Sequence, residues 1–175
     1  MANAANWPPR FARGKRRSQQ VKRSGLAAAV LVLTSVASVA SECRPDVVEL
    51  RGTWGRVRFN VEIADDQLER SRGLMFRESM SPNAGMLFIY DQPQHVRFWM
   101  KNTLISLDML FLDRHGVVTR LHKHAIPGDP TSIFGGNEIF AVLEINGGLT
   151  DHYGITVGSQ MRHPAFSDGP AIWPC

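Results

Sequence analysis

The segment Arg97–Thr103, which reads RFWMKNT, has the residue types best suited to binding a ligand. Side chains alternate between the two faces of a β-strand, so Arg97, Trp99, Lys101 and Thr103 would share one face. An indole between two cations can bind a planar anion, because the ring stacks on the ligand while a cation holds a carboxylate or phosphate. The alternative is that the aliphatic stems of Arg97 and Lys101 cover the indole and leave their charged ends in water.

Charged residues within apolar strings form a second group of candidates. Asp108 lies in the string LDMLFL, Glu144 lies in VLEI, and Arg77 follows an apolar turn. A buried carboxylate needs a partner, so one interpretation is a structural ion pair of Asp108 with Arg77 or Lys101. The other is an acid or base in a cleft. If Asp108 and Glu144 faced each other, they could form the carboxylate pair of a glycoside hydrolase.

A metal site is conceivable at His122 and His124, since a His-x-His pair on a strand points both rings to one face. Asp108 or Glu144 could supply a third ligand. A single His-x-His is weak evidence, however, so we expect no metal and no cofactor. The chain lacks the sequence motifs of serine hydrolases, P-loop enzymes and dinucleotide-binding enzymes, which leaves catalysis undecided and favours a non-enzymatic role.

The elements that position these residues are predicted to be mostly strands. After residue 46, short apolar runs alternate with Gly, Asn, Asp and Pro, which is typical of strands and turns. About eight strands are expected, at residues 47–50, 57–63, 85–90, 96–101, 107–112, 117–121, 139–145 and 155–161. Short strands without a βαβ rhythm favour a mainly β fold, a single compact jelly-roll-like sandwich or a partly closed barrel.

One short helix is predicted, ending near Arg72. Asp66 and Glu69 have the spacing of a capping box, and Gly73 fits the position after the last helical turn. The segments 126–138 and 146–154 are rich in Gly, Pro and Asn, so we expect long surface loops there.

Residues 1–40 have the order of a secretory signal peptide: a basic segment, the apolar run Leu26–Ala40 and small residues before an expected cut at Ser41. As a retained anchor, the run would rise only about 22 Å, less than the ~30 Å hydrocarbon core. A lipoprotein linked through Cys43 and export by the twin-arginine route are alternatives. The expected product is a periplasmic or secreted domain, residues 41–175, that touches the membrane only through its leader before cleavage.

The net charge changes sign when the leader is removed. The chain has 20 Lys+Arg and 16 Asp+Glu, a net charge of +4, and residues 1–40 hold seven of the basic residues and none of the acidic ones. The remaining 13 basic and 16 acidic residues give −3. This balance excludes a nucleic-acid partner, and the hydrophobic content of 43% is that of an ordinary globular domain.

The two cysteines lie at the two ends of the expected mature chain. In an oxidising compartment Cys43 and Cys175 would pair and hold both termini. The alternative is two free thiols at flexible ends. Catalytic or zinc-binding use is improbable, because neither cysteine belongs to a Cys-x-x-Cys motif or a cluster of metal ligands.

Four strings carry a family resemblance: GLMFRE, GMLFIY, FWMKNTLISLDMLFLD and VLEINGG, in this order between Gly73 and Gly148. Together they resemble the DUF192 family, also called UPF0127, over about residues 46–162. The chain has Ser106 where the family most often has proline, a departure expected to change a turn. The resemblance implies a compact, jelly-roll-like β domain and an uncharacterised, often exported prokaryotic protein. It implies no established reaction.

We therefore expect an exported, non-catalytic domain that binds a small molecule, a glycan or an envelope protein. The expected groove is formed by Arg77, Trp99, Lys101, Asn102 and Asp108. The alternative is an envelope-glycan or metal-dependent hydrolase that uses Asp108 and Glu144, or His122 and His124. A structural role in the envelope without a ligand is a third reading.

Overall fold

A single sheet of seven strands dominates residues 43–175, the part of the chain that the computed structural model describes. The predicted signal peptide, residues 1–40, lies outside these residues. The elements in chain order are β1 (Val47–Gly52), β2 (Gly55–Ala64), α1 (Gln67–Arg72), β3 (Ala84–Phe98), β4 (Leu107–Leu112), β5 (Val118–Ala125), β6 (Ile133–Asn146), α2 (Leu149–Tyr153), β7 (Gln160–Arg162) and the 3-10 turn η1 (Pro164–Phe166).

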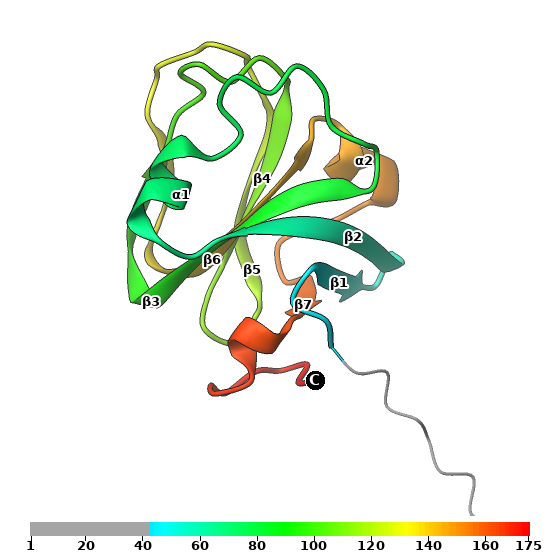
Figure 1. The fold of residues 1–175 in the computed structure, drawn as a ribbon. Helices are drawn as coiled ribbons and strands as arrows, with labels where there is room; N and C mark the ends of the chain where they lie inside the picture. Colours follow the sequence, from blue (N-terminus) through cyan, green and yellow to red (C-terminus); the bar gives the residue numbers. More distant parts are fainter. Residues whose placement is uncertain (1–42) are drawn as a thin grey trace, which may run out of the picture. The chain divides into compact units, whose positions relative to one another are not determined.

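The sheet curls into a partly closed barrel, with strand order β5-β4-β6-β3-β2-β1-β7 (Figure 1). Neighbouring strands are antiparallel except β2 and β3, which are parallel and are connected through α1. At the far edges, Val117 pairs with Gln160, and the Val118 N–H donates to the Ser159 carbonyl oxygen at 2.8 Å. The predicted mainly β fold is therefore confirmed.

Strand alternation divides the buried side chains between the two faces of the sheet. One hydrophobic cluster contains Leu110 and Leu143, and the other contains Met109 and Val142. Both faces of β4 are covered, so all six of its residues are buried. A charged side chain on β4 or in the second half of β6 must therefore enter one of these two clusters.

The predicted helix is confirmed as α1. Its N-cap Asp66 accepts a hydrogen bond from the Glu69 N–H at 2.7 Å, and the Glu69 side chain accepts one from the Asp66 N–H, which completes the capping box. Gly73 follows the last turn with a φ of +49°, a left-handed value that glycine adopts without steric cost.

The predictions of one helix, eight strands and two long loops need correction. β6 begins at Ile133, so the loop predicted at 126–138 ends at residue 132, and the segment 146–154 contains the second helix, α2. The strands predicted at 85–90 and 96–101 are one long strand, β3, whose pairing is irregular around Pro93. Among residues 43–175, no helix is long and apolar enough to span a membrane.

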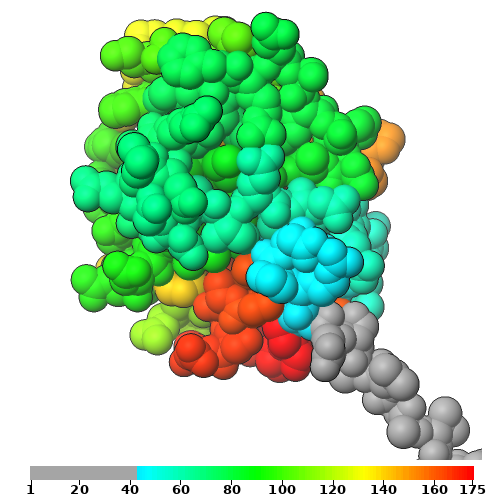
Figure 2. Space-filling view, in the orientation of Figure 1, coloured from blue at the N-terminus to red at the C-terminus, as the bar shows by residue number. Residues whose placement is uncertain are grey.

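The two ends of the domain lie side by side. The C-terminal segment packs beside the residues that lead into β1 (Figure 2), and Cys43 and Cys175 form the predicted disulfide, with their Cα atoms 5.5 Å apart. His163, after β7, lies with its Nε2 2.9 Å from the Pro45 carbonyl oxygen. Burial lowers the pKa of His163, so at neutral pH the ring is uncharged and its Nε2–H donates to this carbonyl.

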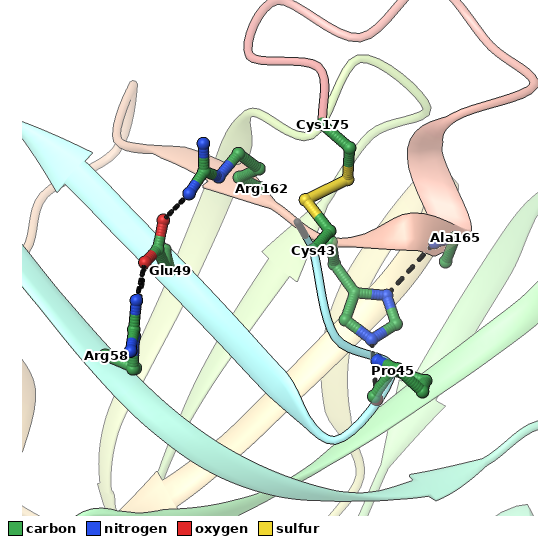
Figure 3. The surroundings of a disulfide bond; sticks show 8 residues. Cys43, Pro45, Glu49, Arg58, Arg162, Ala165 and Cys175 are labelled. Atoms are coloured by element: carbon green, nitrogen blue, oxygen red, sulfur yellow. Dashed lines mark hydrogen bonds and ion pairs between the residues drawn. A yellow bond between two sulfur atoms is a disulfide. The ribbon is translucent and has the colours of Figure 1, made fainter. Parts of the chain in front are cut away.

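Charged pairs reinforce the same junction. Glu49 on β1 binds both Arg58 on β2 and Arg162 on β7 (Figure 3). The Arg51 guanidinium lies 4.3 Å from the centre of the Trp173 ring, in the C-terminal segment. The edge strands β1 and β7 and the chain end are thus held by side-chain contacts as well as by the disulfide.

Loss of the disulfide should lower stability. Cys43→Ser removes a covalent link across 132 residues, and the chain-entropy model assigns such a link about 4 to 5 kcal/mol. We expect a clear drop in melting temperature, measured by circular dichroism. Wild-type protein in dithiothreitol should show the same drop, while the Cys43→Ser/Cys175→Ser double variant should not respond to dithiothreitol. Equal melting temperatures with and without reductant would contradict a stabilising bridge.

Candidate functional site

Asp108 is fully buried and forms four hydrogen bonds, none of them with a cation. Its Oδ1 accepts from the His124 N–H at 2.8 Å, and its Oδ2 accepts from the N–H groups of Gly148 at 3.0 Å and Thr150 at 2.8 Å. The Thr150 hydroxyl donates to the same Oδ2 at 2.6 Å. Asp108 therefore fastens β4 to the end of β5 and to the first turn of α2. The predicted ion pair with Arg77 or Lys101 is wrong.

The idea of a carboxylate pair is also wrong. In the β4–β6 register, Asp108 lies opposite Ile145 and Met109 lies opposite Glu144. Directly paired residues share a face and consecutive residues alternate, so Asp108 and Glu144 point to opposite faces of the sheet. They cannot act on one glycosidic bond.

Three residues of the predicted groove lie in the connections around the end of β3. Arg77 forms a bidentate ion pair with Glu62, at 2.5 and 2.7 Å. Lys101 is exposed in a turn, and Asn102 accepts the Phe76 N–H on its carbonyl oxygen at 2.7 Å. The structure thus places these residues at the surface, apart from the buried Asp108, and the five predicted residues do not line one cavity.

Trp99 lies just beyond the end of β3, with 55% of its surface exposed. Neither neighbouring cation covers its ring: the Arg97 guanidinium lies over Phe134, 5.3 Å from the ring centre, and Lys101 makes no ring contact within the described residues. The indole is therefore open for stacking, and it forms part of the wall of a cavity.

This cavity, here called the Glu144 cavity, has a volume of about 290 Å³ and lies between α1, β3 and β6. Its inner wall consists of buried residues, while its opening is lined by partly or fully exposed arginines and aromatic rings. The residues that define it are Arg70, Arg72, Leu74, Phe88, Tyr90, Arg97, Phe98, Trp99, Thr103 and Glu144.

Glu144 is the buried acid of the cavity, with only 4% of its surface exposed. On β6 it lies between Met86 of β3 and Met109 of β4, and its carboxyl group forms no hydrogen bond within residues 43–175. In that part of the chain every inaccessible polar side-chain atom has a hydrogen-bond partner, so the Glu144 oxygens must open into the cavity. Burial raises the pKa of Glu144 to about 8, which leaves the carboxyl group mostly protonated at pH 7.

The arginines at the opening come from α1 and β3. Arg70 donates to the Ile89 carbonyl oxygen at 2.9 Å and lies over the Tyr90 ring. Burial raises the pKa of Tyr90 to about 12, so the phenol stays neutral. Arg72, at the end of α1, is exposed and has no hydrogen bond or ion pair within the described residues. A cation is thus free at the opening, above a neutral carboxyl group.

Most of these residues were missed by the sequence analysis. Trp99 is predicted as a ligand contact, and Glu144 as a buried carboxylate, as half of a carboxylate pair or as a third metal ligand. Arg70 and Arg72 had one usable signal, a basic last turn on a well-capped helix. The parallel pairing of β2 with β3, which brings α1 and β6 to the same cavity, has no signal in the sequence, because strand pairing is not a local property.

His122 and His124, the weak candidates for a metal pair, do not point their rings to one face. His124 has a φ of +53° where the β4–β5 register shifts, so the two-residue alternation that would align both rings is broken. The His124 ring instead contacts Asp151, with 3.0 Å between Nε2 and Oδ2. No cluster of three potential metal ligands occurs within residues 43–175.

The chain matches known sequences and structures over most of the described domain. The model of the DUF192 family, described as "Uncharacterized ACR", matches residues 48–163. A crystal structure from Novosphingobium aromaticivorans, of a protein of unknown function, is 38% identical with a TM-score of 0.64, and the match covers 66% of this chain and 82% of that one.

A second crystal structure, from Sinorhizobium meliloti, is described as a candidate transcription regulator. It is 34% identical with a TM-score of 0.65, and the match covers 69% of this chain and 94% of that one. No curated protein matches the sequence.

Asp108→Asn should destabilise the domain, because the amide nitrogen cannot accept hydrogen bonds and would face buried donors. We expect a loss of roughly 2 to 4 kcal/mol in the free energy of unfolding, measured by urea denaturation. Asp168→Asn, an exposed position, is the matched control. An unchanged unfolding free energy in Asp108→Asn would show that the four hydrogen bonds do not support the fold.

Relative to wild type, Glu144→Gln should stabilise the domain increasingly as the pH rises from about 4 to 8. The native pKa of about 8 lies above the pKa of Glu144 in the unfolded chain. The free energy of unfolding of wild type is therefore highest below about pH 4, with respect to this group, and falls as the pH rises to 8. The neutral amide avoids this loss, which has a limiting slope of about 1.4 kcal/mol per pH unit.

Thermal melts of Glu144→Gln and wild type should therefore coincide near pH 4 and diverge at pH 9, where the variant melts higher. The control Glu78→Gln alters an exposed carboxylate and should follow wild type throughout. A pH-independent difference between Glu144→Gln and wild type would refute the raised pKa.

Proposed function

This chain belongs to the DUF192 family, and we propose that it is an exported member that binds a small organic molecule in the Glu144 cavity. The carrying observation is the buried Glu144 carboxyl group, which faces a cavity and has no hydrogen-bond partner within the described residues. Because its oxygens open into the cavity and no protein group of residues 43–175 occupies them, a ligand that enters the cavity can form hydrogen bonds with them.

The dimensions of the cavity support a small molecule rather than a polymer. Its volume of about 290 Å³ is at the lower end of the range for small-molecule sites, roughly 300 to 1,000 Å³. Its walls also have the expected composition: aromatic side chains with a few polar groups. Of the predicted partners, a small molecule therefore fits better than an extended glycan or an envelope protein.

Export is supported by two features of the chain. The first forty residues have the order of a signal peptide, and the domain that follows is closed by the Cys43–Cys175 disulfide, a bond typical of oxidising compartments. A periplasmic or secreted binding domain accounts for both features.

The residues named for the hydrolase alternative do not form an active site together. Asp108 is saturated by four hydrogen bonds on the opposite face of the sheet from Glu144, and His124 is paired with Asp151. A single protonated carboxyl group with arginines around it can bind and polarise a ligand, but the second carboxylate of a glycoside hydrolase is not beside it.

Native mass spectrometry of the protein purified from the envelope fraction of its host tests this proposal. The expected mass is that of residues 41–175, less two hydrogens for the disulfide, plus a small organic adduct. Trp99→Ala should lose the adduct, because it removes a wall of the cavity. Ile172→Ala removes an exposed apolar side chain that does not line the cavity, so it should keep the adduct.

An uncut leader would contradict export. An adduct that survives in both Trp99→Ala and Glu144→Ala would show that the ligand binds elsewhere.

A further inference from the structure

We infer that the ligand of the Glu144 cavity is a small, flat carboxylate, held by hydroxyl donors at the inner end and drawn in by guanidinium groups at the opening. This inference rests on the proposed function, because it names the chemical class that the cavity would select. It follows from three parts of the cavity: its inner end, its walls and its opening.

The inner end offers two hydroxyl donors without partners. Thr103 is 5% exposed, lines the cavity, and its hydroxyl group forms no hydrogen bond within residues 43–175. Every inaccessible polar side-chain atom in this region has a hydrogen-bond partner. Since the Thr103 hydroxyl has none, it must, like the Glu144 carboxyl group, open into the cavity. At pH 7 Glu144 is protonated, so both groups can donate an O–H to a ligand.

Two neutral donors suit a carboxylate better than a phosphate. A carboxylate has two oxygens and can accept one hydrogen bond from each hydroxyl group, and O–H to carboxylate bonds are among the stronger ones in proteins. A phosphate monoester would bring three terminal oxygens and more charge to an inner end that has only these two side-chain hydroxyls. At least one of its oxygens would be desolvated without a partner there.

The walls favour a flat apolar body. Phe88 and Phe98 are packed edge to face, with ring centres 5.0 Å apart, so their positions are mutually fixed. Trp99 lines the cavity with its ring uncovered. A planar ring or conjugated chain can stack on such surfaces, whereas a sugar would leave most of its hydroxyl groups without partners.

The opening sets the sign of the ligand charge. Arg70 and Arg72 supply its charge, and Arg72 has no carboxylate partner within the described residues. Arg97 also lines the cavity, but its guanidinium lies over Phe134, which does not. With Glu144 and Tyr90 both neutral at pH 7, the titratable groups that face the cavity carry only positive charge. Such a field attracts an organic anion and repels an ammonium group.

This arrangement makes the affinity for a carboxylate depend on the protonation of Glu144. When Glu144 ionises, the inner end loses one donor and gains a negative charge that repels the bound carboxylate. With a pKa of about 8, the protonated fraction of Glu144 falls about tenfold between pH 7 and pH 9. Carboxylate affinity should fall by about the same factor.

Titration calorimetry with three matched probes tests the inference: benzoate, neutral benzamide and cationic benzylamine, on the oxidised domain at pH 7 and pH 9. Wild type should bind benzoate best and lose about tenfold in affinity at pH 9. Glu144→Gln keeps a donor that does not titrate, so its benzoate affinity should not change with pH. Arg72→Gln should weaken benzoate severalfold at both pH values and leave benzamide unchanged. Arg114→Gln, at a position that does not line the cavity, is the charge-matched control.

Three results would overturn the inference: tighter binding of benzylamine than benzoate, tighter binding of phenyl phosphate than benzoate, or benzoate affinity that rises with pH. Any of these would leave the proposed binding function standing, since the cavity would still be occupied. If no probe binds and the host-purified protein carries no adduct that depends on Trp99, the proposed function fails as well.

Discussion

The register between β4 and β6 is the constraint on which the rest of the structure depends. It sets Asp108 against Ile145 and Glu144 against Met109, and a slip of one residue would put both acids on the same face of the sheet. On one face Asp108 meets four donors and forms a structural anchor. On the other face Glu144 meets apolar neighbours and opens into a cavity. Two carboxylic acids on adjacent strands thus acquire opposite roles from their surroundings alone.

Local signals in the sequence were enough for part of the fold. The Asp66–Glu69 capping box defined α1, alternation defined the strand around Val57, an apolar run defined the strand at Leu107, and the two cysteines indicated their own pairing. The errors arose where tertiary contacts override local preference. β3 continues past Pro93, and β6 begins before two glycines, because neighbouring strands supply their hydrogen bonds. The short helix α2 is held by Asp108, a residue some forty positions earlier in the chain.

The candidate site was less predictable than the fold. An exposed tryptophan beside cations is visible in the sequence, and Trp99 does line the cavity. Strand alternation also predicts that Thr103 lies on the same face as Trp99. Thr103 is buried instead, because β3 ends at Phe98 and the chain turns. Arg70 and Glu144 are separated by more than seventy residues, and only the parallel β2–β3 pairing, with α1 between the two strands, brings them together.

The position of the disulfide has a consequence for how the domain responds to a protease. Because Cys43 precedes β1 and Cys175 follows β7, the bridge encloses all seven strands in one covalent ring. A protease that cuts one exposed connection, such as residues 126–132, opens this ring but releases no fragment. Both pieces stay tethered and keep their strands paired within the same sheet. The domain can therefore be nicked once and still hold together.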